Sequence, residues 1–104
     1  MGEHPTASLD DVVHQKHRLG ILTVAAEAKR VEFGYLRSTL ELTAGNLSRH
    51  IAVLEQAGLV AVEKGYEARR PRTWVSVTPA GLAALAAEMT ALRALVERHV
   101  ASQP

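Results

Sequence analysis

The chain has 104 residues, enough for one domain with a modest core. It contains no cysteine, which excludes disulfides, thiolate metal sites and cysteine nucleophiles and suits a reducing cytoplasm. The formal net charge is only +1, so a surface that binds nucleic acid would need a local cluster of lysine and arginine.

The N-terminal part predicts a flexible arm at residues 1–7, followed by a single domain at 8–99 and a short tail at 100–104. Ser8 followed by Asp11 has the spacing of a capping box, which favours a helix start. The apolar residues beyond it recur at helical spacing, as Leu9, Val12 and Val13 and then as Leu19, Leu22 and Ala26. This pattern fits either one bent helix or two helices across 9–28.

A short strand is predicted next, where the β-favouring residues are Val31, Glu32 and Phe33. Gly34 can then provide a sharp change of direction, because glycine tolerates backbone conformations that other residues avoid. The two leucines that follow, Leu36 and Leu40, share one face of a helix.

The next helix is predicted at 44–57. Thr43 is suited to cap its N-terminus, and Gly58 can adopt the left-handed conformation that ends a helix. The apolar stripe of this helix consists of Leu47, Ile51 and Leu54. Leu42 and Thr43 therefore mark a tight turn between two helices.

Two half-buried strands with alternating valines follow, at 60–63 and 74–77. The residues between them, 66–72, are too polar for a core and are predicted to form an exposed hairpin loop. Thr78 and Pro79 fit the cap and first position of a last helix, at 78–99. This element order predicts a mainly α fold with a small β-hairpin, a winged helix-turn-helix with a long C-terminal dimerisation helix.

Helix 44–57 has the division that a DNA-reading helix needs, with a buried stripe on one side and short polar side chains on the other. Asn46 and Arg49 carry donors suited to adenine and guanine edges, and small residues beside them permit close approach. The residues expected to contact DNA here are Thr43, Gly45, Asn46, Ser48 and Arg49. A plain surface helix with a few polar residues is the alternative interpretation.

Positive charge is concentrated around the hairpin loop. Residues 64–72 contain four basic residues against Glu67, which gives +3, and the rest of the chain is then −2. The four are Lys64, Arg69, Arg70 and Arg72. Guanidinium groups suit phosphate oxygens, and Pro71 stiffens the loop, so we expect contacts to the DNA backbone or minor groove rather than a merely solvated hairpin end.

Together these segments resemble the compact winged-helix regulators of the MarR and ArsR types. The resemblance spans about residues 9–99 and is most specific in the stretches 42–51 and 54–60. The arginine-proline-arginine loop, followed by the residues at 77–81, is also typical of these regulators. The resemblance implies a dimeric protein that binds specific DNA sequences and controls transcription.

The last helix carries a heptad seam suited to packing against another helix. The seam consists of Leu82, Leu85, Met89, Leu92, Val96 and His99. We expect it to form a homodimer interface, with contributions from Leu9, Val12 and Val13. The alternative is that the helix folds back on its own domain. A two-fold dimer would present two reading helices to half-sites about one DNA turn apart.

The sequence therefore predicts a cytoplasmic, homodimeric regulator that binds double-stranded DNA, with repression as the expected effect. A winged-helix module that binds a protein partner and no DNA is the alternative, although the arginine cluster argues against it. No enzyme activity, cofactor or membrane association is expected. His14 and His17 could share a helix face, but no third ligand follows at a diagnostic spacing, so no metal site is predicted. Whether a small-molecule effector binds is left open, because no cluster of polar residues identifies a binding site for one.

Overall fold

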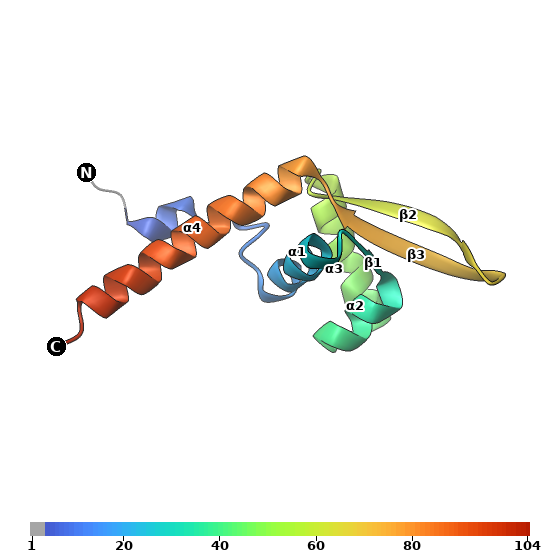
Figure 1. Ribbon diagram of the computed structural model, residues 1–104, viewed down its shortest axis with the longest axis horizontal. Coiled ribbons are helices and arrows are strands. Elements are labelled where there is room, and N and C mark those ends of the chain that lie inside the picture. The colour runs from blue at the N-terminus through green and yellow to red at the C-terminus, as the bar shows by residue number, and fades with distance from the viewer. Residues whose placement is uncertain (1–3) are drawn as a thin grey trace.

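The computed structural model describes residues 4–104 and has three helices and a small sheet at its centre (Figure 1). From this body a β-hairpin extends to one side and a long helix to the other, so the molecule measures 59 × 25 × 21 Å. The elements are η1 (Pro5–Ser8), α1 (Lys16–Ala28), β1 (Arg30–Glu32), α2 (Phe33–Leu40), α3 (Ala44–Gln56), β2 (Val60–Glu67), β3 (Arg70–Val77) and α4 (Pro79–Ala101). The predicted winged helix-turn-helix is confirmed.

The sheet is antiparallel, with β3 between β1 and β2. Val75 of β3 lies opposite Val31 of β1 and Val62 of β2, so this row of valines crosses the sheet on the side that faces the core. The predicted short strand is present but ends at Glu32, and Phe33 already belongs to α2. The apolar stripe predicted for α3 is buried as expected, at Leu47, Ile51 and Leu54.

The segment before α1 differs from the sequence-based prediction, because residues 9–15 form a turn instead of a helix. The Asp10 carboxylate accepts hydrogen bonds from the backbone N–H groups of Val12 (2.8 Å) and Val13 (3.3 Å). An aspartate that binds neighbouring amides in this way competes with helix formation. A single helix, α1, therefore begins at Lys16, where the side chain of Gln15 caps its first turn.

The predicted arm is also structured from residue 4 onward. Pro5–Ser8 form the 3-10 helix η1, which lies along α4 (Figure 1). Ser8 ends this short helix and caps no α-helix, so the capping box expected at Ser8 is not formed. The remainder of the predicted arm, residues 1–3, lies outside the described residues.

Gly34 does not form the sharp turn predicted for it. It lies in the first turn of α2, and the chain changes direction one residue earlier, between Glu32 and Phe33. Glu32 takes the cap position there with an extended backbone. No unusual backbone angle is needed at this junction, so it does not require glycine.

The ends of α3 follow the predicted capping pattern. Thr43 accepts a hydrogen bond from the Asn46 N–H at 3.1 Å. At the other end Gly58 has a φ of 78°, and the Leu59 N–H donates to the Leu54 carbonyl at 2.9 Å. This is the left-handed glycine stop that satisfies the last carbonyl groups of a helix.

The same glycine stop connects α3 to the beginning of α4. The Thr78 hydroxyl donates to the Gly58 carbonyl at 2.7 Å, and the Thr78 N–H donates to the Leu59 carbonyl at 3.0 Å. Thr78 also caps α4 by accepting from the Gly81 N–H at 3.0 Å. We call this set of contacts, made by Gly58, Leu59, Thr78 and Gly81, the α3–α4 joint.

The hairpin is longer and more regular than the seven-residue loop that the sequence predicted. β2 and β3 pair along their full length to Glu67 and Arg70, so only Ala68 and Arg69 form the turn. Both turn residues have positive φ angles, 51° and 68°. The outer part of the hairpin projects beyond the core, so most of its side chains are exposed and the alternation of apolar and polar residues that marks a strand is lost in the sequence.

The helix α4 lies mostly outside the small body. Its inner side is held by Glu88, a buried carboxylate that contacts His14 and the Asp10 N–H. By length and composition alone α4 could cross a membrane, a property that it shares with many core helices. Glu88 and Arg93 lie in the middle of this apolar helix.

Candidate nucleic-acid interface

The outward side of α3 carries the side chains predicted to read DNA. Gly45, Asn46, Ser48 and Arg49 are all exposed. The Arg49 Nη2 donates to the Asn46 Oδ1 at 2.6 Å, so the two longest of these side chains are held together. Thr43 is also exposed, but its hydroxyl is used as the helix cap. An arginine aligned by an asparagine one turn away is suited to bidentate contact with a base edge.

Behind this surface, His50 joins α3 to α1. Its ring lies 5.3 Å from the ring of His17, and the Arg18 guanidinium approaches its Nδ1 at 3.3 Å. Partial burial lowers the pKa of His50 below its ordinary value of 6.5, and the neighbouring His17, Arg18 and Arg49 lower it further.

Arg18 also supports the turn before α1. Its Nε donates to the Val12 carbonyl at 2.6 Å, and its Nη2 donates to the Asp11 carbonyl at 3.3 Å. Arg18 could not be expected from the sequence to connect this turn to α3, because the contact to His50 spans 32 positions.

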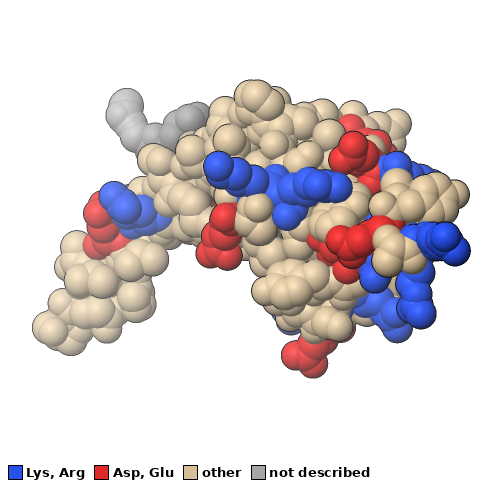
Figure 2. Space-filling model, turned by 45° about the vertical axis from the view of Figure 1, so that its right-hand side comes forward, with Lys and Arg blue, Asp and Glu red and all other residues tan. Residues whose placement is uncertain are grey.

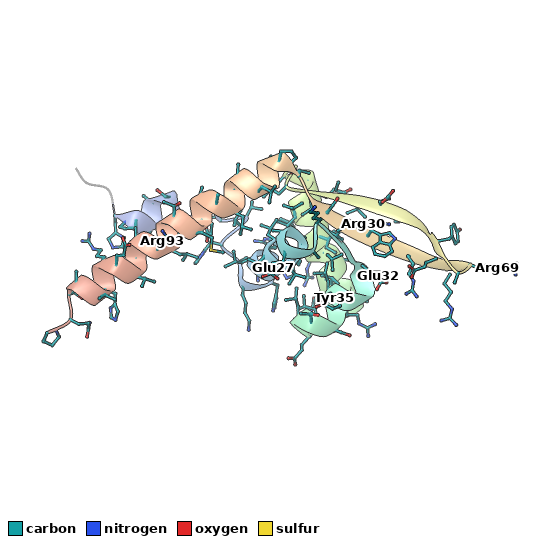
Figure 3. The ribbon with its side chains drawn as sticks, in the orientation of Figure 1. Glu27, Arg30, Glu32, Tyr35, Arg69 and Arg93 are labelled. Carbon is teal, nitrogen blue, oxygen red and sulfur yellow. The ribbon has the colours of Figure 1, made fainter. Side chains whose placement is uncertain are left out.

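Arg69 and Arg70 at the end of the hairpin are both exposed, and Arg69 lies at its tip (Figure 3). Arg72 has a different environment from these two residues. Its Nη1 lies 3.3 Å from Glu32 and its Nε lies 3.6 Å from Glu67, so its charge is used to attach the hairpin to β1. The prediction grouped Arg72 with the DNA-binding arginines, because neither glutamate contact is visible in the sequence.

The helix α3 and the hairpin border a common groove. Its lining includes Ser48 and Ala52 from α3, Lys64 from β2 and Thr73 from β3, around a volume of about 300 Å³. The two elements therefore adjoin each other. Figure 2 shows basic side chains gathered at the hairpin end of the molecule, with acidic side chains among them.

Tyr66 is a feature of the hairpin that we did not single out from the sequence. It is 79% exposed and lies opposite Pro71, so an aromatic ring and a proline stand next to the arginines of the tip. The sequence did contain a signal that Tyr66 could bind a partner, because it is a tyrosine in a polar, basic loop. Tyrosine combines an apolar ring with a hydroxyl that can donate a hydrogen bond.

The predicted dimer residues divide into two groups. Val13 is fully buried in the core of its own chain and offers no surface to a partner, whereas Leu9 and Val12 are half-buried. On α4 the seam residues face outward to different degrees. Leu82, Met89 and Val96 are 49%, 41% and 61% exposed, Leu85 and Leu92 are half-buried and His99 is exposed.

Comparison with known proteins agrees with the winged-helix fold. Residues 17–96 match a family model described as a winged helix DNA-binding domain. An uncharacterized protein from Methanocaldococcus jannaschii is 36% identical over 64 residues, which are 62% of this chain and 70% of that protein.

Solved structures are similar along nearly the whole chain. A transcriptional regulator homologue from Pyrococcus horikoshii has a TM-score of 0.83 at 32% identity, covering 92% of this chain and 96% of that one. A transcriptional regulator of the MarR family from Enterococcus faecalis has a TM-score of 0.72 at 24% identity, covering 91% and 84%. At 24% identity, the similarity to the Enterococcus faecalis protein is evidence for the fold alone.

Proposed function

This chain belongs to the winged helix DNA-binding domain family, and from this premise we propose that it is a sequence-specific transcriptional regulator that acts as a homodimer. Membership in this family places it with DNA-binding regulators and not with enzymes, as the sequence predicted. The resemblance to winged-helix regulators of the MarR and ArsR types is likewise confirmed. The mode of DNA binding, the dimer, the repressing effect and a cytoplasmic location are our proposals.

In the proposed complex α3 enters the major groove, and the hairpin contacts the backbone or minor groove. The observation that carries this proposal is the groove shared by α3 and the hairpin, with Ser48 on one wall and Lys64 on the other. Arg49 and Asn46 are assigned to base edges. Arg69 and Arg70 are assigned to phosphates, because they are exposed and make no ion pair within residues 4–104.

The proposed dimer is built on α4. A helix of 23 residues is about 35 Å long, at roughly 1.5 Å per residue, and much of its apolar surface is uncovered in a single chain. Leu82, Met89 and Val96 lie along that surface with 41% or more of each side chain exposed. Burying such a seam against a second copy is the arrangement that its heptad spacing favours. Light scattering is expected to give twice the mass of one chain, and a monomeric mass would contradict the dimer.

The experiment begins with selection of bound sequences from random DNA, which gives both the site and its half-site spacing. Fluorescence anisotropy then compares the selected site with a scrambled one. Arg49→Ala is expected to reduce the preference for the selected site by about 5-fold to 100-fold, the usual range for one bidentate base contact. Arg70→Ala is expected to weaken binding to both DNAs alike and to lower the salt dependence by about one phosphate contact.

Arg93→Ala is the matched control, because Arg93 is an exposed arginine on α4, away from the hairpin (Figure 3). It removes the same charge and is expected to leave both DNA affinities nearly unchanged. If Arg49→Ala and Arg70→Ala behave like this control, the proposed binding surface is wrong. Capture of a protein partner, with no DNA bound at low salt, would favour the alternative of a protein-interaction module.

A further inference from the structure

The two sides of the hairpin differ, because side chains alternate from one face of a strand to the other. Val62 of β2 and Val75 of β3 are paired and belong to the side that packs on the core. Lys64 and Thr73 are the next pair outward on this side, and both line the groove beside α3. We call this the α3-facing side of the hairpin.

The α3-facing side continues to Tyr66 and Pro71, which form the next pair after Lys64 and Thr73. Two residues of a strand span about 7 Å, so Tyr66 is displaced by that distance from Lys64 toward the hairpin turn. Tyr66 is 79% exposed, and Pro71 opposite it is exposed as well. The hairpin therefore presents an aromatic ring and a proline ring on the same side as α3.

The opposite side of the sheet and hairpin carries the acidic groups, because all three glutamates of the strands alternate to that side. Arg72 lies 3.3 Å from Glu32 and 3.6 Å from Glu67. Arg30 lies 3.7 Å from Glu63. Carboxylates repel phosphates, so the α3-facing side is the side better suited to face DNA.

We propose that Tyr66 is a specificity-determining residue of the DNA site and contacts the minor groove next to the major groove that α3 enters. This inference rests on the proposed function and names a further residue that contributes to it. Ser48 and Lys64 lie on the two walls of the groove, so one sugar-phosphate ridge of the DNA fits between α3 and the hairpin. Tyr66, farther out on the hairpin, then lies beyond that ridge.

The chemistry of tyrosine fits the minor groove. Its ring packs against deoxyribose, and its hydroxyl donates to N3 of adenine or O2 of thymine, the acceptors that an A·T pair presents there. A G·C pair adds the amino group of guanine to the floor of this groove. We therefore expect Tyr66 to favour A·T pairs beneath the hairpin, outside the bases that α3 contacts.

The test uses the DNA site selected from random sequences in two forms, which differ only in the base pairs that flank the α3 half-sites. One form has A·T pairs in the flanks and the other has G·C pairs, and the unmodified protein is expected to prefer the A·T form. Tyr66→Phe keeps the ring and removes the hydroxyl. It should lower this preference about 2-fold to 10-fold, the usual range for one hydrogen bond.

Tyr66→Ala removes the ring as well and is expected to weaken binding to both forms about 5-fold or more. The contact is not ionic, so the dependence of affinity on salt should stay as in the unmodified protein, whereas Arg70→Ala lowers it. A merely structural role of Tyr66 would not give Tyr66→Phe a loss confined to the A·T form.

Tyr35→Ala is the matched control, because Tyr35 is an exposed tyrosine on α2, outside the groove beside α3. Figure 3 shows Tyr35 on the helical body, whereas Arg69 marks the tip of the hairpin. Both tyrosines are exposed, so neither substitution should change the midpoint temperature of unfolding appreciably. If Tyr66→Ala binds both DNA forms as tightly as Tyr35→Ala does, the proposal is overturned.

Methylation by dimethyl sulfate locates the contact, because it modifies adenine at N3 in the minor groove and guanine at N7 in the major groove. At saturating protein, Tyr66→Ala is expected to lose the protection of adenine N3 in the flanks and to keep that of guanine N7 under α3. Unchanged protection of adenine N3 overturns the assignment of Tyr66 and leaves the role of α3 intact. Failure of the unmodified protein to bind any selected DNA contradicts the proposed function as well.

Discussion

The Nδ1 of His14 lies 2.5 Å from the Oε2 of Glu88, and this glutamate side chain is completely buried. The other oxygen of the carboxylate accepts only a long hydrogen bond from the Asp10 N–H, at 3.4 Å. The pair therefore attaches the turn before α1 to the middle of α4. A buried carboxylate needs such a partner, because an uncompensated charge inside a protein is strongly unfavourable.

His14→Ala is expected to lower the free energy of unfolding by about 1–3 kcal/mol, because it leaves the Glu88 carboxylate without its main partner. Urea denaturation measures the change, with an unchanged m-value as the sign that the fold is retained. His4→Ala is the control, since His4 is exposed and, among residues 4–104, its side chain hydrogen-bonds only to the neighbouring Thr6. Equal effects of the two substitutions would show that the contact to Glu88 contributes nothing.

Gly81→Ala tests the α3–α4 joint. A Cβ at position 81 would lie 2.0 Å from the Leu59 carbonyl oxygen, so the two segments would have to separate. We expect a destabilisation of about 1–3 kcal/mol, the range for overpacking. Gly45→Ala is the matched control, because a Cβ there meets nothing within 4 Å and alanine favours a helix. The midpoint temperature of thermal unfolding should therefore fall for Gly81→Ala and stay unchanged or rise for Gly45→Ala.

The hairpin turn predicts a stabilising substitution. Ala68 has a φ of 51°, in the left-handed region that asparagine tolerates much better than alanine. Ala68→Asn is expected to raise the free energy of unfolding by about 0.5–1 kcal/mol without changing the charge of the hairpin. Ala61→Asn is the control, since Ala61 is exposed near the beginning of β2 and lacks a positive φ. A stabilisation at both positions, or at neither, would contradict this account of the turn.

The lowered pKa of His50 predicts that the stability of the folded chain depends on pH. Its pKa is below 6.5 in the folded chain, so the unfolded chain binds more protons as the pH falls through that value. The contribution of His50 to stability is thus complete above pH 6.5 and is lost progressively below it, toward the lower pKa of the folded chain. NMR titration should place the pKa of His50 below 6.5, and Arg49→Gln should raise it by removing a nearby positive charge. A pKa of 6.5 or above in the unmodified protein would contradict the prediction.

The sequence predicted the fold well wherever local signals and packing agree. Leu47, Ile51 and Leu54 have helical spacing and are buried, and Thr43 and Thr78 cap the helices that they precede. The failures have local physical causes. Asp10 binds the amides of residues 12 and 13, which turns an apparently helical pattern into a bend.

The candidate site was predicted only in part, because several of its contacts join distant positions. The exposure of Asn46 and Arg49 follows from the stripe on the opposite side of α3. The attachment of Arg72 to Glu32 spans 40 positions, and a count of charges cannot distinguish a paired arginine from a free one. The same limit applied to the pairing of His14 with Glu88.

The α3–α4 joint has a consequence for the shape of the bound DNA. Thr78 holds the end of α3 to the start of α4, because its hydroxyl donates to the Gly58 carbonyl and its N–H donates to the Leu59 carbonyl. The two helices are therefore fixed relative to each other. In a pair of chains joined along α4, the two copies of α3 would then stand at a set separation and tilt. An operator whose helical repeat does not match this geometry would have to bend or twist to fit. Its flexibility at base pairs that the protein never touches would therefore influence which operators are chosen.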